Sequence, residues 1–245
     1  ERLFALTPDG RQTMLFSATM PGAIVSLARK YQNRPIHIRV NDPDEGHTKA
    51  DIKQFIYRAH SLDKDEVVGR ILQAEGRGKT VIFCRTKRQA GKVAEELVDR
   101  GFNASALHGD MSQEAREKSM AAFRSGKKDI LVATEVAARG IDVDDVTHVI
   151  NYTVPEDEKN YLHRTGRTGR AGASGLAVSL VSATEWNLMI SIERYLKLNF
   201  ERRSLAGLKA RYSGPKKQKT SGKAAGSKKK AVSYFRSSSC VLLLL

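Results

Sequence analysis

The chain has 245 residues, and its 40% of hydrophobic residues is enough apolar material for a globular core. Its formal charge is +15, but residues 202–245 contain twelve Lys or Arg and no Asp or Glu, so the rest of the chain is nearly neutral. Two distant cysteines, Cys84 and Cys240, exclude a disulfide framework and a cysteine-based zinc site, and no apolar run reaches the roughly 18 residues of a membrane span. We therefore expect a cytoplasmic protein without a membrane partner.

The first 50 residues predict a small piece of α/β structure followed by a linker. An apolar run at Thr13–Phe16 predicts a strand, and the turn after it leads into a helix that ends near Tyr31. A second extended segment, Ile36–Val40, precedes residues 41–50, whose polar side chains, proline and glycine are typical of a linker. Because Glu1 rather than Met opens the chain, we expect a fragment of a longer protein.

Residues 51–203 alternate between short apolar runs and amphipathic segments. Continuous apolar runs indicate strands buried on both faces of a parallel sheet, and the amphipathic segments between them indicate covering helices. We therefore expect an α/β fold with a parallel sheet and helices on both faces. The expected strands are Ile52–Ala59, Thr80–Cys84, Ala104–Leu107, Asp129–Ala133, His148–Asn151 and Leu176–Val181, and the expected helices are Lys64–Gly76, Lys87–Arg100, Gln113–Arg124, Tyr161–Thr168 and Glu185–Leu196.

Residues 204–245 differ in composition from the rest of the chain. They are rich in Lys, Gly, Ser and Ala, which cannot bury enough apolar surface to order a segment. We expect a disordered basic tail. Such a tail attracts phosphate backbones without regard to sequence, and the alternative is a solvated segment that only keeps the protein soluble.

Polar side chains follow three of the expected strands at the point where each strand ends. Arg85–Lys87 follow the strand that ends at Cys84, His108–Asp110 follow Leu107, and Thr134 with Glu135 follows Ala133. Ligands of open parallel sheets bind at the carboxyl ends of the strands. The sequence therefore predicts a ligand site at this edge of the sheet.

Three arginines recur at every third position in His163–Arg170, separated by glycines. This spacing predicts several guanidinium groups on one side of a short helix, where they match phosphate oxygens and where glycine allows close backbone approach. No acidic residue lies between Tyr161 and Ala183. The segment therefore indicates phosphate binding, and the alternative is a helix of surface ion pairs.

These segments resemble, in order and spacing, the motifs of DEAD-box RNA helicases. Related helicases usually carry Gln where this chain has His163, so the histidine favours the DEAD-box group. The chain departs from the pattern of that group at two positions. Glu135 stands where Asp is commoner, and Arg85 stands where the family often has Asn. The resemblance implies a RecA-like fold. The segments that carry it are Ser17–Thr19, Val81–Lys87, Gln113–Arg116, Phe123–Gly126, Ala133–Asp142 and His163–Arg170.

The resemblance also implies roles for individual residues. Arg167 and Arg170 would be arginine fingers that reach the γ-phosphate of ATP, with His163 in the same catalytic motif, and Asp142 and Gly140 would contact the nucleotide. Ser17 and Thr19 would couple the nucleotide state to RNA binding. No metal ligand is expected in this chain, and the Mg²⁺ that accompanies ATP would be held by the first domain. The expected RNA-binding residues are Thr86, Gly109, Arg116, Gly126, Thr134 and Arg139.

The implied organisation is a remnant of the first RecA-like domain at 1–40, a linker at 41–50, the helicase C-terminal RecA-like domain at 51–203 and the tail at 204–245. No Gly-x-x-x-x-Gly-Lys-Ser/Thr phosphate loop and no Asp-Glu-Ala-Asp occurs, and Gly78–Thr80 precedes a predicted strand instead of following one. The fragment alone is therefore expected to be inactive.

The expected partners are RNA, the N-terminal RecA-like domain of the same protein, and ribosome or RNA-decay proteins. Two other functions stay open at this point. One is a non-catalytic RNA-binding module or docking platform, and the other is a double-strand DNA translocase of the same superfamily.

Overall fold

The structure, a computed structural model, describes residues 6–8, 10–16, 22–38, 52–73, 77–138, 143, 145–170 and 173–208. The chain divides into two compact units, Glu1–His47 and Thr48–Leu245. In the smaller unit, helix α2 spans Gly22–Tyr31, as the sequence predicts. The predicted strand at Thr13–Phe16 is wrong, because a strand requires a hydrogen-bonded neighbour and the described part of this unit offers none.

The smaller unit leaves large apolar side chains in contact with solvent. Met14, Phe16, Ile36 and Ile38 are 68–88% exposed, and α2 buries Ala28. Alternating apolar residues normally indicate a segment with one buried face. The two segments therefore have the pattern of strands without a sheet around them.

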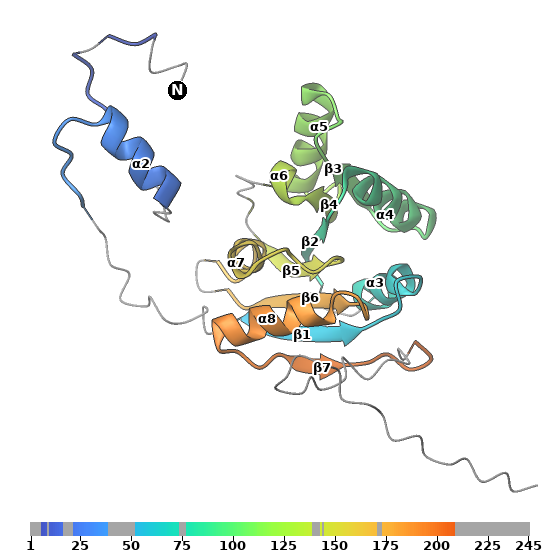
Figure 1. Cartoon of the computed structure of the whole chain (residues 1–245). Helices are drawn as coiled ribbons and strands as arrows, with labels where there is room; N and C mark the ends of the chain where they lie inside the picture. Colours follow the sequence, from blue (N-terminus) through green and yellow to red (C-terminus); the bar gives the residue numbers. More distant parts are fainter. Residues whose placement is uncertain are drawn as a thin grey trace, which may run out of the picture. The chain divides into compact units, whose positions relative to one another are not determined.

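The larger unit contains a seven-stranded, fully parallel sheet with the order β3-β4-β2-β5-β6-β1-β7. The predicted parallel sheet with helices on both faces is confirmed (Figure 1). The strands are β1 (Ile52–Arg58), β2 (Lys79–Cys84), β3 (Ala104–Leu107), β4 (Ile130–Thr134), β5 (Val146–Asn151), β6 (Gly175–Val181) and β7 (Glu201–Arg203). The helices of this unit are α3 (Lys64–Leu72), α4 (Lys87–Asp99), α5 (Gln113–Arg124), α6 (Glu135–Ala138), α7 (Glu158–Thr165) and α8 (Trp186–Leu196).

Two elements were not anticipated from the sequence, α6 and β7. Helix α6 is a single turn, too short for a hydrophobic period to be visible. Strand β7 consists of Glu201, Arg202 and Arg203, which are exposed at the edge of the sheet. Pairing with Phe55–Tyr57 of β1 makes these charged residues a strand, and their own composition does not predict one.

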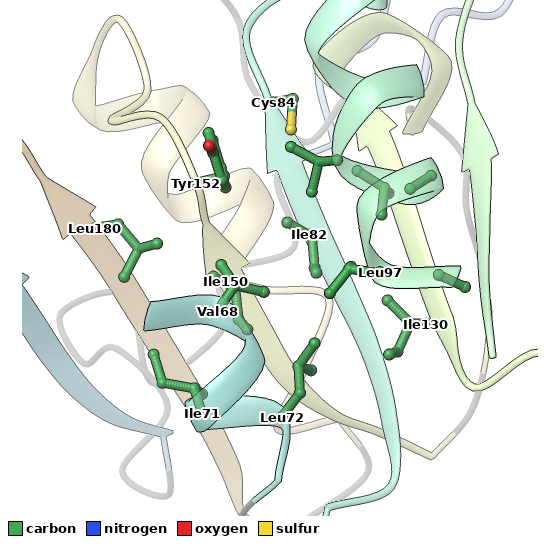
Figure 2. Close-up of a cluster of buried hydrophobic side chains, with 14 of the residues drawn as sticks. Val68, Ile71, Leu72, Ile82, Cys84, Leu97, Ile130, Ile150, Tyr152 and Leu180 are labelled. Atoms are coloured by element: carbon green, nitrogen blue, oxygen red, sulfur yellow. The ribbon is translucent and has the colours of Figure 1, made fainter. Parts of the chain in front are cut away.

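The central strands are apolar on both faces because each face is covered by helices. Along β2, Ile82 and Cys84 point to one side, where α3 and α4 pack, and Val81 and Phe83 point to the other. Figure 2 shows the first of these layers, with Val68, Ile71 and Leu72 of α3 facing β2, β5 and β6. The second layer is formed by α5 and α6 over β2, β3 and β4, and by α7 and α8 near β1.

The beginning of the expected tail belongs to the folded unit. Leu205 and Leu208 pack against the core layer of α3, and the Arg70 guanidinium donates to the Ala206 carbonyl at 2.9 Å. The expected start of the tail at residue 204 is therefore too early, because two leucines in a basic segment suffice to hold it against the sheet. Residues 209–245 lie outside the described part of the chain.

The sequence argues against a phosphate loop at Gly78–Thr80 and against a membrane-spanning segment, and the described residues bear on both. Gly78 directly precedes β2, and Lys79 and Thr80 begin that strand, so this segment leads into a strand and does not have the strand-loop-helix context of a phosphate loop. No described helix combines the length and the hydropathy that crossing a bilayer would demand.

Candidate nucleic-acid and phosphate interface

Three predicted RNA-binding residues lie at the carboxyl ends of three neighbouring strands. Gly109 follows β3, Thr134 ends β4 and Thr86 follows β2, and the sheet order places β4 between the other two. Parallel strands bring these ends to one edge. The structure therefore unites residues that are separated by up to 48 positions in the sequence.

The loops on either side of Thr134 are tied to each other. Lys87 Nζ lies 2.5 Å from Asp110 Oδ1, which links the start of α4 to the loop after β3. Thr86 caps α4, since its hydroxyl accepts from the Gln89 amide at 3.2 Å, and a side chain at Gly109 would touch Lys87. Thr86 and Gly109 are exposed, whereas Thr134 is buried. This edge therefore presents the Thr86 hydroxyl and the Gly109 backbone next to the Lys87 side chain.

Arg116 lies next to this edge, in the first turns of α5. Ser112 caps the helix by accepting from the Ala115 amide at 3.2 Å, which sets where α5 begins after β3. The Arg116 side chain is half-buried, and its Nε is buried with no hydrogen-bond partner within the described structure. Because the side chain is only half-buried, the accessible part of its guanidinium can pair with a phosphate.

Gly126 does not join the other predicted RNA-binding residues. Helix α5 runs back across the sheet, and the Arg124 carbonyl at its end accepts from Lys79 Nζ, at the amino end of β2, at 2.9 Å. Gly126 follows with φ +78°, a left-handed conformation that glycine adopts without strain after a helix. Gly126 lies at the opposite edge because α5 runs from the carboxyl edge to the amino edge of the sheet. Its positive φ after the helix is a structural reason for a glycine at this position.

The segment with three arginines is anchored by the first of them. Arg164 is 4% exposed; its Nε pairs with Glu135 Oε2 at 2.5 Å and its Nη1 donates to the Thr153 carbonyl at 2.9 Å. The guanidinium also lies over the Phe83 ring, 5.1 Å from its centroid. The predicted group of guanidinium side chains on one side therefore does not include Arg164, which points into the domain.

Arg167 and Arg170 follow the anchored turn and stay half-exposed. Arg167 Nε donates to the His163 carbonyl at 3.3 Å, and Arg170 Nε donates to the Gly166 carbonyl at 3.0 Å. These contacts use one donor of each guanidinium for local backbone. His163 itself is exposed. The segment therefore presents the half-exposed Arg167 and Arg170 beside an exposed histidine.

The backbone that carries these two arginines is held at the amino ends of the strands. The buried Thr168 hydroxyl donates to the Val146 carbonyl at the start of β5, at 2.5 Å. Gly169 has φ +65°, and a Cβ there would stand 2.5 Å from Ile52 Cγ1. A Cβ at Gly175 would lie equally close to Thr168. Only glycine fits at these two positions, which fixes Thr168 and Gly169 close to the starts of β1, β5 and β6.

The remaining predicted site residues lie outside the described ranges, and their roles stay predictions: Ser17, Thr19, Arg139, Gly140 and Asp142. Within those ranges no cluster of three or more His, Cys, Asp or Glu side chains could hold a metal ion.

Burial is the main cause of the shifted pKa values of Cys84, Tyr152 and His148. It raises the pKa of the Cys84 thiol to about 12, so this cysteine stays protonated and is unsuited to nucleophilic chemistry. Burial and a 2.8 Å hydrogen bond to Asp65 raise the pKa of the Tyr152 hydroxyl. Burial, together with the charge of Arg77, lowers the pKa of His148 from 6.5. Neither side chain is poised for acid–base chemistry near neutral pH.

The sequence did not predict two ion pairs at the carboxyl edge of the sheet, Arg164–Glu135 and Lys64–Glu185. Glu135 lies 29 residues before Arg164, and Lys64 lies 121 residues before its partner Glu185. No local pattern marks such pairs, because the sheet order alone brings them together.

Known proteins match this fold and these segments. A family model described as the helicase conserved C-terminal domain matches residues 63–172. The ATP-dependent RNA helicase DeaD of Klebsiella pneumoniae is 44% identical over 198 residues, which are 81% of this chain and 30% of that relative. The ATP-dependent RNA helicase CshA of Limosilactobacillus reuteri is 39% identical, with 81% and 39% covered. The chain thus spans well under half of the length of these curated relatives.

Two solved structures extend the comparison to the fold. The yeast protein Dbp5 of S. cerevisiae, solved with RNA and ADP BeF3, matches 83% of this chain and 54% of its own, with a TM-score of 0.73 and 30% identity. The E. coli DEAD-box protein SrmB, solved with the regulator of ribonuclease activity A, is 35% identical with a TM-score of 0.65, and the match covers 68% of this chain and 98% of that one. With this identity over a whole solved domain of the same fold, the chain belongs to the DEAD-box RNA helicase family and carries its C-terminal RecA-like domain.

Proposed function

We propose that this chain supplies the RNA-backbone contacts and the arginine fingers of an ATP-dependent RNA helicase that separates short RNA duplexes or remodels RNA–protein complexes. The observation that carries the proposal is the alignment of Gly109, Thr134 and Thr86 along three adjacent strand ends. Hydroxyl groups, open backbone and arginine side chains are the groups that contact nucleic-acid backbones without reading bases.

The RNA strand would cross the carboxyl edge over β3, β4 and β2. Gly109 would admit the strand closely, Thr86 and Thr134 would offer hydroxyls, and Arg116 would pair with a phosphate. Arg139 would extend the same contact set. Gly126 is left out of this surface, since it lies at the opposite edge of the sheet.

The nucleotide would meet the domain at the arginine segment. ATP with Mg²⁺ supplies the transferable phosphoryl group, and the half-exposed guanidinium groups of Arg167 and Arg170 fit a triphosphate. Arg164, held by Glu135, would fix the helix that presents them, and the glycine-restricted loop would keep their spacing. Asp142 and Gly140 would contact the rest of the nucleotide, and Ser17 and Thr19 would report its state to the RNA surface.

The first domain of the same protein would complete the site. Residues 1–40 would belong to that domain, because Met14, Phe16, Ile36 and Ile38 have the exposure of strand residues that lack their sheet. Residues 41–50 would be the linker, and the Mg²⁺ ligands would come from the first domain. A cytoplasmic location and contacts with ribosome or RNA-decay proteins remain predictions.

RNA-stimulated ATP hydrolysis tests this proposal. We expect no turnover by the chain alone, and turnover when it is fused to a first domain of the same family. Arg167→Ala should then reduce the turnover number about 10³- to 10⁵-fold, because a finger stabilises charge that develops on the transferred phosphoryl group. Arg194→Ala, at an exposed position of α8, is the matched control and should leave the rate unchanged.

Three outcomes would contradict the proposal in different ways. Turnover by the chain alone would reveal a separate nucleotide site. A fusion that binds RNA but never hydrolyses ATP would favour the RNA-binding module. Strand displacement on double-stranded DNA in preference to RNA would favour a DNA translocase.

A further inference from the structure

A pocket of about 300 Å³ opens at the carboxyl edge, next to Thr86 but beyond the RNA surface described above. It lies where β2, β5 and β6 end and where α3, α4 and α8 begin. Ligand pockets in proteins range over roughly 300–1,000 Å³, so this volume suits one small unit such as a single nucleotide.

The floor of the pocket is a buried and electrically balanced ion pair. Lys64 Nζ lies 2.7 Å from Glu185 Oε2, with 4% and 12% of the side chains exposed. The Glu185 carboxylate also accepts from the Ser182 amide and hydroxyl and from the Val154 amide, at 2.5–3.1 Å. Lys64 donates again to the Tyr152 carbonyl at 2.7 Å. Both charges are therefore paired within the protein, and together they add no net charge to the pocket.

The rim of the pocket carries the unbalanced charge. Arg85 is exposed there, and its guanidinium makes a long hydrogen bond of 3.5 Å to the Val154 carbonyl. Glu185 is the one acidic side chain among the described residues that line the pocket, and Lys64 already neutralises it. Hydroxyl groups of Thr86, Thr153 and Thr184 complete the wall, and the Thr153 hydroxyl is buried without a described partner. One free positive charge among hydroxyl donors is the chemistry of a phosphate subsite.

We propose that this pocket binds a further nucleotide unit of the RNA strand, adjacent to the one at Thr86, and that Arg85 holds its phosphate. The inference rests on the proposed function, since it extends the RNA path from the end of β2 toward β5 and β6. Thr86 belongs to both surfaces, which makes the two continuous. Because an asparagine cannot supply the charge, Arg85 gives this chain a contact that DEAD-box proteins with Asn at this position lack.

The salt dependence of RNA binding tests the pocket. The unmodified chain and its variants would be titrated onto a fluorescent oligouridylate of about 10 nucleotides, within the roughly 4–16 that such surfaces span. Arg85→Asn should lower the magnitude of the slope of log affinity against log salt by about 0.7, the value for one phosphate contact on a single strand. Arg85→Lys should retain the slope. Arg88→Asn removes the same charge from an exposed position outside the pocket, and should change the slope much less.

The outcomes separate this inference from the proposed function. If Arg116→Ala reduces the slope and Arg85→Asn does not, the RNA path stops at Thr86 and the pocket proposal fails alone. If neither variant changes the slope, or the unmodified chain does not bind RNA at low salt, the proposed RNA surface fails as well. Equal losses for Arg85→Asn and Arg88→Asn would mean diffuse attraction and overturn the subsite. Amide NMR shifts around residues 85–89 caused by inorganic phosphate but not by the RNA would assign the pocket to a free anion.

Discussion

Replacing Arg164 with methionine removes the charge that anchors the arginine segment and keeps most of the side-chain volume. In the native structure its guanidinium pairs with Glu135 and donates to the Thr153 carbonyl and to Asn151 Oδ1. The variant leaves the Glu135 carboxylate without its cation and the two oxygens without a donor. A buried acceptor without a partner costs stability because water cannot replace the lost bond.

The size of the effect follows from the burial of the two partners. Removing one member of a buried ion pair costs about 3–5 kcal/mol. The Arg164 side chain is 5% exposed and Glu135 is 22% exposed, so water can partly solvate the carboxylate that remains. We therefore expect Arg164→Met to lower the free energy of unfolding by about 3 kcal/mol, the lower end of that range.

Urea unfolding measures this loss directly. Trp186 is the single tryptophan, begins α8 and is buried in the core, so its fluorescence follows the unfolding of this domain. Adding Glu135→Gln completes a double-mutant cycle, in which the double variant should be about 1–2 kcal/mol more stable than the sum of the single losses predicts. Lys87→Met, which breaks the exposed pair with Asp110, is the control and should have little effect.

A loss below about 1 kcal/mol for Arg164→Met, or additive losses in the cycle, would refute this reasoning. Either result would mean that packing, and not the ion pair, holds α7 against α6. The role proposed for Arg164 in presenting Arg167 and Arg170 would then lose its physical basis.

Two further predictions concern the arginine loop and the response to pH. Gly169→Ala should destabilise the domain more than Gly101→Ala. Both positions have a positive φ, but only at Gly169 would the added Cβ meet another atom closely, Ile52 Cγ1 at 2.5 Å. Equal melting temperatures of the two variants would contradict this contact. For His148, the folded pKa lies below 6.5, so the unfolded chain binds the proton more tightly and stability falls as the pH drops through about 6.5. His148→Asn should flatten the unfolding free energy between about pH 7 and pH 5, and an unchanged profile would show that burial does not oppose protonation there.

The sequence by itself determined six of the seven strands and the residues at the carboxyl edge of the sheet. Continuous apolar runs such as Val81–Cys84 are specific to strands covered on both faces, and glycine with arginine at a spacing of three is specific enough to mark His163–Arg170. The carboxyl ends of parallel strands lie at the same edge of a sheet whatever the order of the strands. Thr86, Gly109 and Thr134 could therefore be grouped before the strand order was known.

Only the tertiary structure decided how these residues divide between surfaces. The direction of α5 takes Gly126 to the opposite edge, and the strand order turns Arg164 inward to Glu135 and joins Lys64 to Glu185. Charged residues 201–203 become a strand because β1 offers them an edge. Pairing, burial and long-range charge compensation depend on which segments meet in space, and a local pattern of residues carries no information about that.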